Sequence, residues 1–288
     1  MTAPPENRLP NFLYIGPDRA GSTWTFQLLV WHPQVLTPAV KELFFFDRNY
    51  QRGLNWYSKH FPPRTPHTRI LAELSHDYLY SPQACERIAA RLPGVRVMVC
   101  LREPVDRAFS AYLNMLRHGL VPDDFAAALK QEPGLIEHGR YTEPLRRYIE
   151  RLGRDRVYVS IFDDLEADPG AFASQLFEYL GVDNIPLPEE MYAKALPAGV
   201  ARFPPAARAA KQAALIIRRA GFPEIVGRVK SSPFVQRTLY KALSNGDKPR
   251  PDPALARQLK DGFRDDVAAL DALLGTQLTK RWGYDSKD

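Results

Sequence analysis

Short, almost uninterrupted apolar runs alternate along the chain with longer stretches in which apolar residues recur every three or four positions. The apolar runs predict buried strands at 11–16, 69–74, 95–103 and 156–165. The periodic stretches predict helices at 22–32, 84–94, 105–119, 142–153, 170–181 and 252–275. Buried strands separated by helices indicate an α/β protein with a parallel central sheet that helices cover on both faces.

The loop between the first strand and the first helix carries the first sign of chemistry. Residues 15–24 read IGPDRAGSTW, a G-x-x-x-x-G pattern followed by Ser22 and Thr23, either of which is a candidate N-cap. A loop that leads from a buried strand into a helix presents several backbone N–H groups to an anion. Arg19 would add a cation inside the loop, although a simple tight turn with a solvated Arg19 would fit the same letters.

A second stretch with similar chemistry is VCLREPVDRAFSAY. Arg102 lies at the end of the most strongly predicted strand, so it is expected at the carboxyl edge of the sheet, where open α/β sheets bind ligands. Ser110 follows within the next helix, and the two side chains could hold a second phosphate. The alternatives are an ion pair of Arg102 with Glu103 or Asp106, and an ordinary helix serine at position 110.

Charge is unevenly distributed along the 288 residues. The net charge is +6, yet residues 202–250 contain eleven Lys and Arg against two acidic residues, or +9. This segment, with a basic amphipathic helix predicted at 204–220, is a candidate lid for an anionic acceptor or a contact for an anionic lipid surface, or else a solvated helix face. We expect no disulfide scaffold, because the sequence has only two cysteines. We expect a cytoplasmic protein, because the sequence shows neither a signal pattern nor an apolar run of membrane-spanning length.

Taken together, these motifs resemble the sulfotransferases that use 3′-phosphoadenosine 5′-phosphosulfate (PAPS). RAGST at 19–23 is similar to the family's first motif, and LREPVDRAFSAY at 101–112 matches the second throughout. KELFFFDRNYQRGLNWYSKHF at 41–61 and AELSHDYLYSP at 72–82 resemble segments of the glycan-modifying, heparan-type branch of O- and N-sulfotransferases. The likeness covers about 11–182 and 249–282.

The resemblance implies a single sulfotransferase domain over 1–288 with a P-loop NTPase-like α/β fold and a basic helical insertion or lid at about 196–248. It implies PAPS as donor, PAP as product, no metal, and a hydroxyl acceptor on a carbohydrate, glycolipid or other glycoconjugate. Glu42 would be the general base, and Lys41 would line the sulfuryl site. The donor-binding residues that it implies are Arg19, Ala20, Gly21, Ser22 and Thr23 for the 5′-phosphosulfate, Arg102 and Ser110 for the 3′-phosphate, and Lys248 and Arg250 on a late basic loop.

Two departures from the family pattern bear on these expectations. The heparan-type branch has lysine where Arg19 stands, and an arginine can stabilise charge on the leaving phosphate but cannot act as its acid, because its pKa exceeds 12. Leu74 and His76 replace a lysine and a proline of the family's acceptor segment. His76 is thereby a further candidate catalytic residue, and His60 and His118 are alternative bases.

Two other classes of function remain as alternatives. A P-loop kinase of a small metabolite would carry a lysine at position 22, where this chain has serine. A non-enzymatic nucleic-acid-binding protein would use the basic segment, but no recognised nucleic-acid motif accompanies it. Nucleic acid is therefore not expected as a partner.

Overall fold

The computed structural model describes residues 8–192, 199–201, 240–242 and 249–285. The chain divides into two compact units, the first formed by residues 1–102 and 143–195 and the second by 103–142 and 196–288. The predicted helix at 204–220 and most of the predicted insertion at 196–248 lie outside the described residues. The single-domain prediction for 1–288 stays a prediction.

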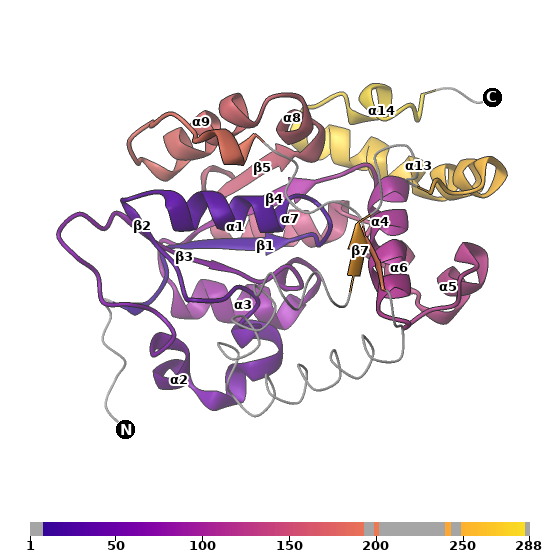
Figure 1. Cartoon of the computed structure of the whole chain (residues 1–288). Helices are drawn as coiled ribbons and strands as arrows, with labels where there is room; N and C mark the ends of the chain where they lie inside the picture. Colours follow the sequence, from indigo (N-terminus) through magenta and orange to yellow (C-terminus); the bar gives the residue numbers. More distant parts are fainter. Residues whose placement is uncertain (1–7, 193–198, 202–239, 243–248, 286–288) are drawn as a thin grey trace. The chain divides into compact units, whose positions relative to one another are not determined.

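A five-stranded parallel sheet forms the centre of the first unit (Figure 1). Its strands follow the order β2-β3-β1-β4-β5 and pair in parallel throughout. The strands are β1 (Phe12–Gly16), β2 (Val35–Leu36), β3 (Ile70–Leu74), β4 (Arg96–Leu101) and β5 (Val157–Ile161). The predicted α/β class with a helix-covered parallel sheet is therefore confirmed.

Helices and short helical turns join these strands. The α-helices of the first unit are α1 (Ser22–Trp31), α2 (Leu54–Ser58), α3 (Pro82–Arg91), α7 (Thr142–Leu152), α8 (Phe162–Ala167) and α9 (Pro169–Leu180). The shorter turns are the π-helix η2 (Phe45–Asn49) and the 3₁₀ turns η3 (Tyr50–Arg52), η4 (Tyr78–Tyr80), η5 (Arg154–Arg156) and η6 (Glu189–Met191). Figure 1 shows α1 and α9 on one side of the sheet and α3 on the other.

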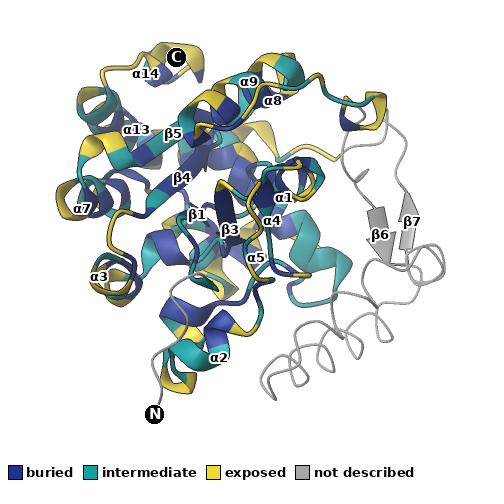
Figure 2. Cartoon of the chain, turned by 90° about the vertical axis from the view of Figure 1, so that its left-hand side faces the viewer, coloured by how far each residue is buried: buried dark blue, intermediate teal, exposed yellow. Residues whose placement is uncertain are grey.

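The alternation of side chains along each strand explains this layering. On β1 and β4, Phe12, Tyr14 and Met98 face the core that α1 and α9 cover, where Leu28 and Phe177 are fully buried. The neighbouring residues on each strand point to the opposite face. Figure 2 shows the central strands as buried, with exposed residues concentrated on the outer surfaces of the helices.

One predicted boundary was wrong. The apolar run at 156–165 predicted a single strand, but β5 ends at Ile161 and α8 begins at Phe162. Phe162 and Leu165 look strand-like in the sequence because they are apolar. In the structure they cover Gly21 of the β1–α1 loop, where a Cβ would lie 2.8 Å from the Leu165 Cδ2 atom.

The second unit holds the helix of the LREPVDRAFSAY motif. Its described elements are α4 (Pro104–Arg117), α5 (Phe125–Gln131), α6 (Gly134–Glu137), α13 (Pro253–Leu274), α14 (Leu278–Arg281) and the antiparallel pair β6 (Gly199–Ala201) and β7 (Tyr240–Ala242). Glu103 caps α4 by accepting a hydrogen bond from the Asp106 amide at 2.7 Å, and its other carboxylate oxygen accepts one from the Tyr284 hydroxyl. Arg107 is buried and donates to the Leu135 carbonyl.

Among the helices that the structure describes, none combines the length and the apolar character needed to cross a membrane.

Candidate functional site

The carboxyl ends of three adjacent strands in the first unit bring the predicted residues together. Tyr14 of β1 pairs with Leu74 of β3, and Gly16 pairs with Val99 of β4, so the three strands end at one edge of the sheet. The Nη1 atom of Arg102 donates a hydrogen bond to the Arg19 carbonyl at 3.0 Å. The two segments that the sequence singled out therefore meet at the sheet edge where ligands bind in open α/β folds.

The β1–α1 loop at this edge has left-handed backbone at two positions. The Tyr14 hydroxyl donates to the Pro17 carbonyl at 2.7 Å from beneath the loop. Arg19 is exposed and left-handed, with a φ of 63°, and Gly21 has a φ of 83°. Gly21, not Ser22 or Thr23, is the N-cap residue of α1, and no side chain of the described residues caps this helix. The N–H groups of its first turn and the Ser22 and Thr23 hydroxyls are thus arranged for a ligand rather than for a cap.

Lys41 places an ammonium group over this helix terminus. Its Nζ atom donates hydrogen bonds to the Thr23 Oγ1 atom at 2.9 Å and to the Ser22 Oγ atom at 3.4 Å, and it lies 3.5 Å from the Glu42 Oε1 atom. Only 23% of the Lys41 side chain is exposed. A cation beside the positive end of a helix dipole is unfavourable unless an anion lies between or near them. Glu42 supplies one such anion, and the first-turn N–H groups, the two hydroxyls and Lys41 are together suited to binding an anionic ligand.

Glu42 lies beside Lys41 in an unusual backbone conformation. Its φ of 69° is left-handed, and its N–H donates to the Leu74 carbonyl at 2.6 Å. Its carboxylate is 17% exposed and lies 3.8 Å from the Nε2 atom of His76. A simple ion pair of Glu42 with Lys41 would give Glu42 a non-catalytic role, and this pair is present. Both side chains are largely buried, however, and Lys41 also donates to the Ser22 and Thr23 hydroxyls of α1. Strain and shelter together are typical of a functional carboxylate.

His76 connects Glu42 with a charged pair on the other side. Its Nδ1 atom lies 2.7 Å from the Asp77 Oδ1 atom, and Asp77 is paired in turn with Arg48. Burial lowers the pKa of His76, although Glu42 and Asp18 oppose this change. A neutral imidazole beside Glu42 can accept a proton near neutral pH.

Of the other two candidate histidines, His60 belongs to the first unit and His118 to the second. His60 packs edge-on against Trp56 at a centroid distance of 4.4 Å, and the Nδ1 atom of His118 lies 2.6 Å from the Asn114 carbonyl oxygen. Neither contact involves Glu42 or the loop. His76 is thus the candidate histidine that the structure brings to Glu42.

The sequence did not point to a buried polar group behind the Glu42 segment. Glu73 on β3 is fully buried and hydrogen-bonded to Ser75, Tyr57 and Tyr78. Burial raises the pKa of its carboxyl to about 7. A charged residue inside the apolar run RILAEL was the one available signal.

The remaining predicted donor-binding residues belong to both units or lie outside the described residues. Ala20 is a buried residue of the β1–α1 loop. Ser110 lies on α4 and Arg250 is exposed in the segment before α13, both in the second unit, and Lys248 lies outside the described residues. Their joint action with Arg102 on the 3′-phosphate stays a prediction.

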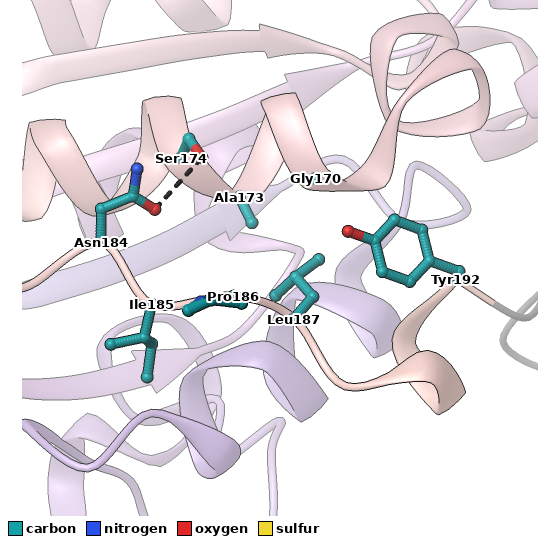
Figure 3. Close-up of a pocket in the computed structure, with 8 residues that line it drawn as sticks. All are labelled: Gly170, Ala173, Ser174, Asn184, Ile185, Pro186, Leu187 and Tyr192. Atoms are coloured by element: carbon teal, nitrogen blue, oxygen red, sulfur yellow. Dashed lines mark hydrogen bonds between the residues drawn. The ribbon is translucent and has the colours of Figure 1, made fainter.

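A surface pocket of about 250 Å³ lies elsewhere in the first unit (Figure 3). It is bounded by α9 and the segment that follows this helix, with Tyr192 at one side and the hydrogen-bonded pair of Ser174 and Asn184 at the other. None of the predicted site residues lines this pocket.

Comparison with known proteins identifies the family. The family model described as "Sulfotransferase domain" matches residues 9–194. The chain belongs to the sulfotransferase domain family. Over 214 residues, 66% of the chain, this family member is 30% identical to the human bifunctional heparan sulfate N-deacetylase/N-sulfotransferase 3, of which the match covers 24%. Over 160 residues, 50% of the chain, it is 31% identical to the membrane-associated sulfotransferase kil1 of Dictyostelium discoideum, of which the match covers 34%.

A solved structure supports the fold of this sulfotransferase-family chain. The sulfotransferase from Alicyclobacillus acidocaldarius superposes with a TM-score of 0.59 and 24% sequence identity, covering 76% of this chain and 96% of that one. The predicted P-loop-like sulfotransferase fold is confirmed. The chain spans about a quarter to a third of the length of the curated relatives described above.

Proposed function

We propose that this protein transfers the sulfuryl group of PAPS to an acceptor group on a glycan or glycoconjugate. The observation that carries the proposal is the position of Lys41, whose ammonium lies within hydrogen-bond reach of Thr23 at the N-terminus of α1 and 3.5 Å from the Glu42 carboxylate. Lys41 therefore lies between the N-terminus of α1, which can bind an anion, and Glu42, which can accept a proton.

The proposed reaction is an in-line displacement at sulfur. The acceptor oxygen forms a bond to sulfur as the bond between sulfur and the bridging phosphosulfate oxygen breaks, and PAP leaves with the electron pair. Glu42 takes the acceptor proton, and a positioned base of this kind contributes a factor of roughly 10²–10⁴ in rate. Lys41, Thr23 and the first-turn N–H groups of α1 stabilise the negative charge that develops on the leaving oxygen.

His76 has a supporting part in this proposal. Because its pKa is lowered, it is neutral near pH 7 and can take over the proton that Glu42 has accepted. Arg19 and Arg102 hold the donor electrostatically, and Arg102 is fixed by its hydrogen bond to the Arg19 carbonyl and by stacking over Phe162 at 4.6 Å. The acceptor class is supported by the human relative, whose name describes activity on heparan sulfate.

A panel experiment tests the proposal. Purified protein is incubated with radiolabelled PAPS and a set of hydroxyl- and amine-bearing glycans and glycolipids, and PAP binding is measured in parallel by calorimetry. We expect PAP to bind without Mg²⁺ and label to appear in at least one glycan. Glu42→Gln should keep PAP affinity and lose at least 10²-fold in turnover. Normal turnover of Glu42→Gln would remove Glu42 from the mechanism, and binding of ATP with Mg²⁺ in preference to PAP would favour the kinase alternative.

A further inference from the structure

Behind the candidate base lies a polar cluster that the proposed reaction does not itself use. It consists of Glu73, Ser75, Tyr57 and Tyr78, all of them buried. Glu73 lies on β3 between Ala72 and Leu74, so the alternation of the strand points its side chain away from the face covered by α1 and α9. Burying a carboxyl group is costly unless hydrogen bonds compensate for the lost hydration, which calls for an explanation of its presence.

The carboxylate of Glu73 accepts hydrogen bonds from three hydroxyl groups. Ser75 donates through its Oγ atom to Oε1, Tyr57 donates through its hydroxyl to Oε2 at 3.4 Å, and Tyr78 forms a further side-chain hydrogen bond. An ionised carboxylate can only accept hydrogen bonds, so each of these hydroxyls donates its single proton to Glu73. The remaining lone pairs of these oxygens are then fixed in direction.

Two of those oxygens accept hydrogen bonds from the main chain that follows Glu42. The Ser75 Oγ atom accepts from the Phe44 N–H at 3.0 Å, and the Tyr78 hydroxyl accepts from the Phe45 N–H at 2.8 Å and the Phe46 N–H at 3.3 Å. Phe44 has a φ of 48°, the second left-handed residue within three positions of Glu42. Left-handed non-glycine residues persist only where the surrounding structure holds them.

We infer that Glu73 is a positioning residue for the proposed reaction: its carboxylate orients the Ser75 and Tyr78 hydroxyls, which hold the main chain of 44–46 and thereby keep the Glu42 carboxylate beside Lys41. This inference rests on the proposed role of Glu42. Glu73 touches neither donor nor acceptor in this scheme. Its effect passes through two hydroxyl groups and one strained segment.

The charge state of Glu73 determines which groups in the cluster donate hydrogen bonds and which accept them. If Glu73 binds a proton, it becomes a donor, and a hydroxyl that now accepts from it can no longer serve the main-chain N–H groups in the same way. The titratable groups that face Glu73 are Tyr57 and Tyr78, both with pKa values raised well above the usual range, and Asp47 of η2, whose charge raises the pKa of Glu73 further. The Glu73 pKa of about 7 therefore predicts that turnover falls as the pH drops below 7.

Amide hydrogen exchange tests the structural half of the inference without any enzyme assay. Tyr78→Phe removes the acceptor of two N–H groups, whereas the matched control Tyr148→Phe removes an equally buried hydroxyl that donates to the Tyr78 carbonyl instead. We expect the amides of residues 44–46 to exchange at least 10-fold faster in Tyr78→Phe and Glu73→Gln than in Tyr148→Phe. Equal exchange in all three variants would overturn the inference.

Turnover tests the functional half. Glu73→Gln should lower kcat roughly 10- to 100-fold, the range expected for a misplaced reacting group, with the Kd for PAP unchanged within about 2-fold. In Glu73→Gln the decline of kcat should also begin at a lower pH than in the wild type, because only the decline caused by protonation of His76 remains. Glu73→Asp should restore part of both properties. A Glu73→Gln enzyme with wild-type kcat and pH profile, alongside an inactive Glu42→Gln enzyme, would overturn the inference. If no glycan accepts label, the proposed function fails, and the exchange result alone decides whether the cluster holds the segment.

Discussion

Replacing Glu73 by glutamine should make the stability of the protein less dependent on pH. The pKa of Glu73 is about 7 in the folded state and 4.5 for the unperturbed side chain. Between these values the folded state binds a proton that the unfolded state does not, so the free energy of unfolding falls as the pH rises. The stabilisation is fully present below pH 4.5 and is lost as the pH passes through 7. Because one pKa unit corresponds to about 1.4 kcal/mol, the loss is on the order of 3 kcal/mol.

The assay is urea unfolding at pH values from 4.5 to 8.5, followed by tryptophan fluorescence in the wild type and in Glu73→Gln. The difference in unfolding free energy between the two proteins should shift by on the order of 3 kcal/mol in favour of the variant across this range. Glu86→Gln is the control for the same substitution at the surface, because Glu86 is 60% exposed and paired with Arg151. A difference between wild type and Glu73→Gln that stays constant with pH would refute the reasoning.

Three further predictions concern the loop and its cations. Gly16→Ala should lose roughly 2–6 kcal/mol of stability in thermal unfolding, because its Cβ would lie 2.2 Å from the His76 carbonyl oxygen at a φ of 139°. The control Gly53→Ala, with a φ of 80° but no atom within 4 Å of its Cβ, should lose only about 1–2 kcal/mol. Equal losses in the two variants would contradict the steric argument. Lys41→Met should weaken PAP binding roughly 10- to 100-fold in calorimetry, the value of one or two charge-assisted hydrogen bonds, while the exposed control Lys59→Met should bind normally. Arg102→Ala should abolish PAP binding in a thermal-shift assay and leave the melting temperature of the unliganded protein within a few degrees of the wild type; retained PAP stabilisation would remove Arg102 from the donor site.

The elements that place the loop could be predicted closely from the sequence. The predicted strand at 11–16 and helix at 22–32 match β1 and α1 to within one residue, because an apolar run ending in glycine and a helical apolar period are both local signals. The boundary between β5 and α8 was missed for the opposite reason. Phe162 and Leu165 are apolar because they cover the β1–α1 loop, and nothing in their local spacing records that distant contact.

The candidate site divides in the same way. Arg19, Glu42 and Arg102 could be found because each belongs to a short motif. The contact of Lys41 with Thr23, and the cluster of Glu73 with Tyr57 and Tyr78, join residues that are 5 to 18 positions apart through the ends of different strands and helices. Hydrophobic patterning gives no information on such pairings, because it reports which face is buried and not which polar atoms meet there.

The left-handed backbone at Glu42 has a consequence for attempts to engineer the protein. A glutamate with a φ of 69° is strained by roughly 1–2 kcal/mol, and glycine or asparagine adopts the same conformation more readily. A library screened for thermal stability alone would therefore enrich glycine and asparagine at position 42, and the selected proteins would be more stable but would lack the Glu42 carboxylate. Screens for robustness and screens for turnover should thus diverge at this one position.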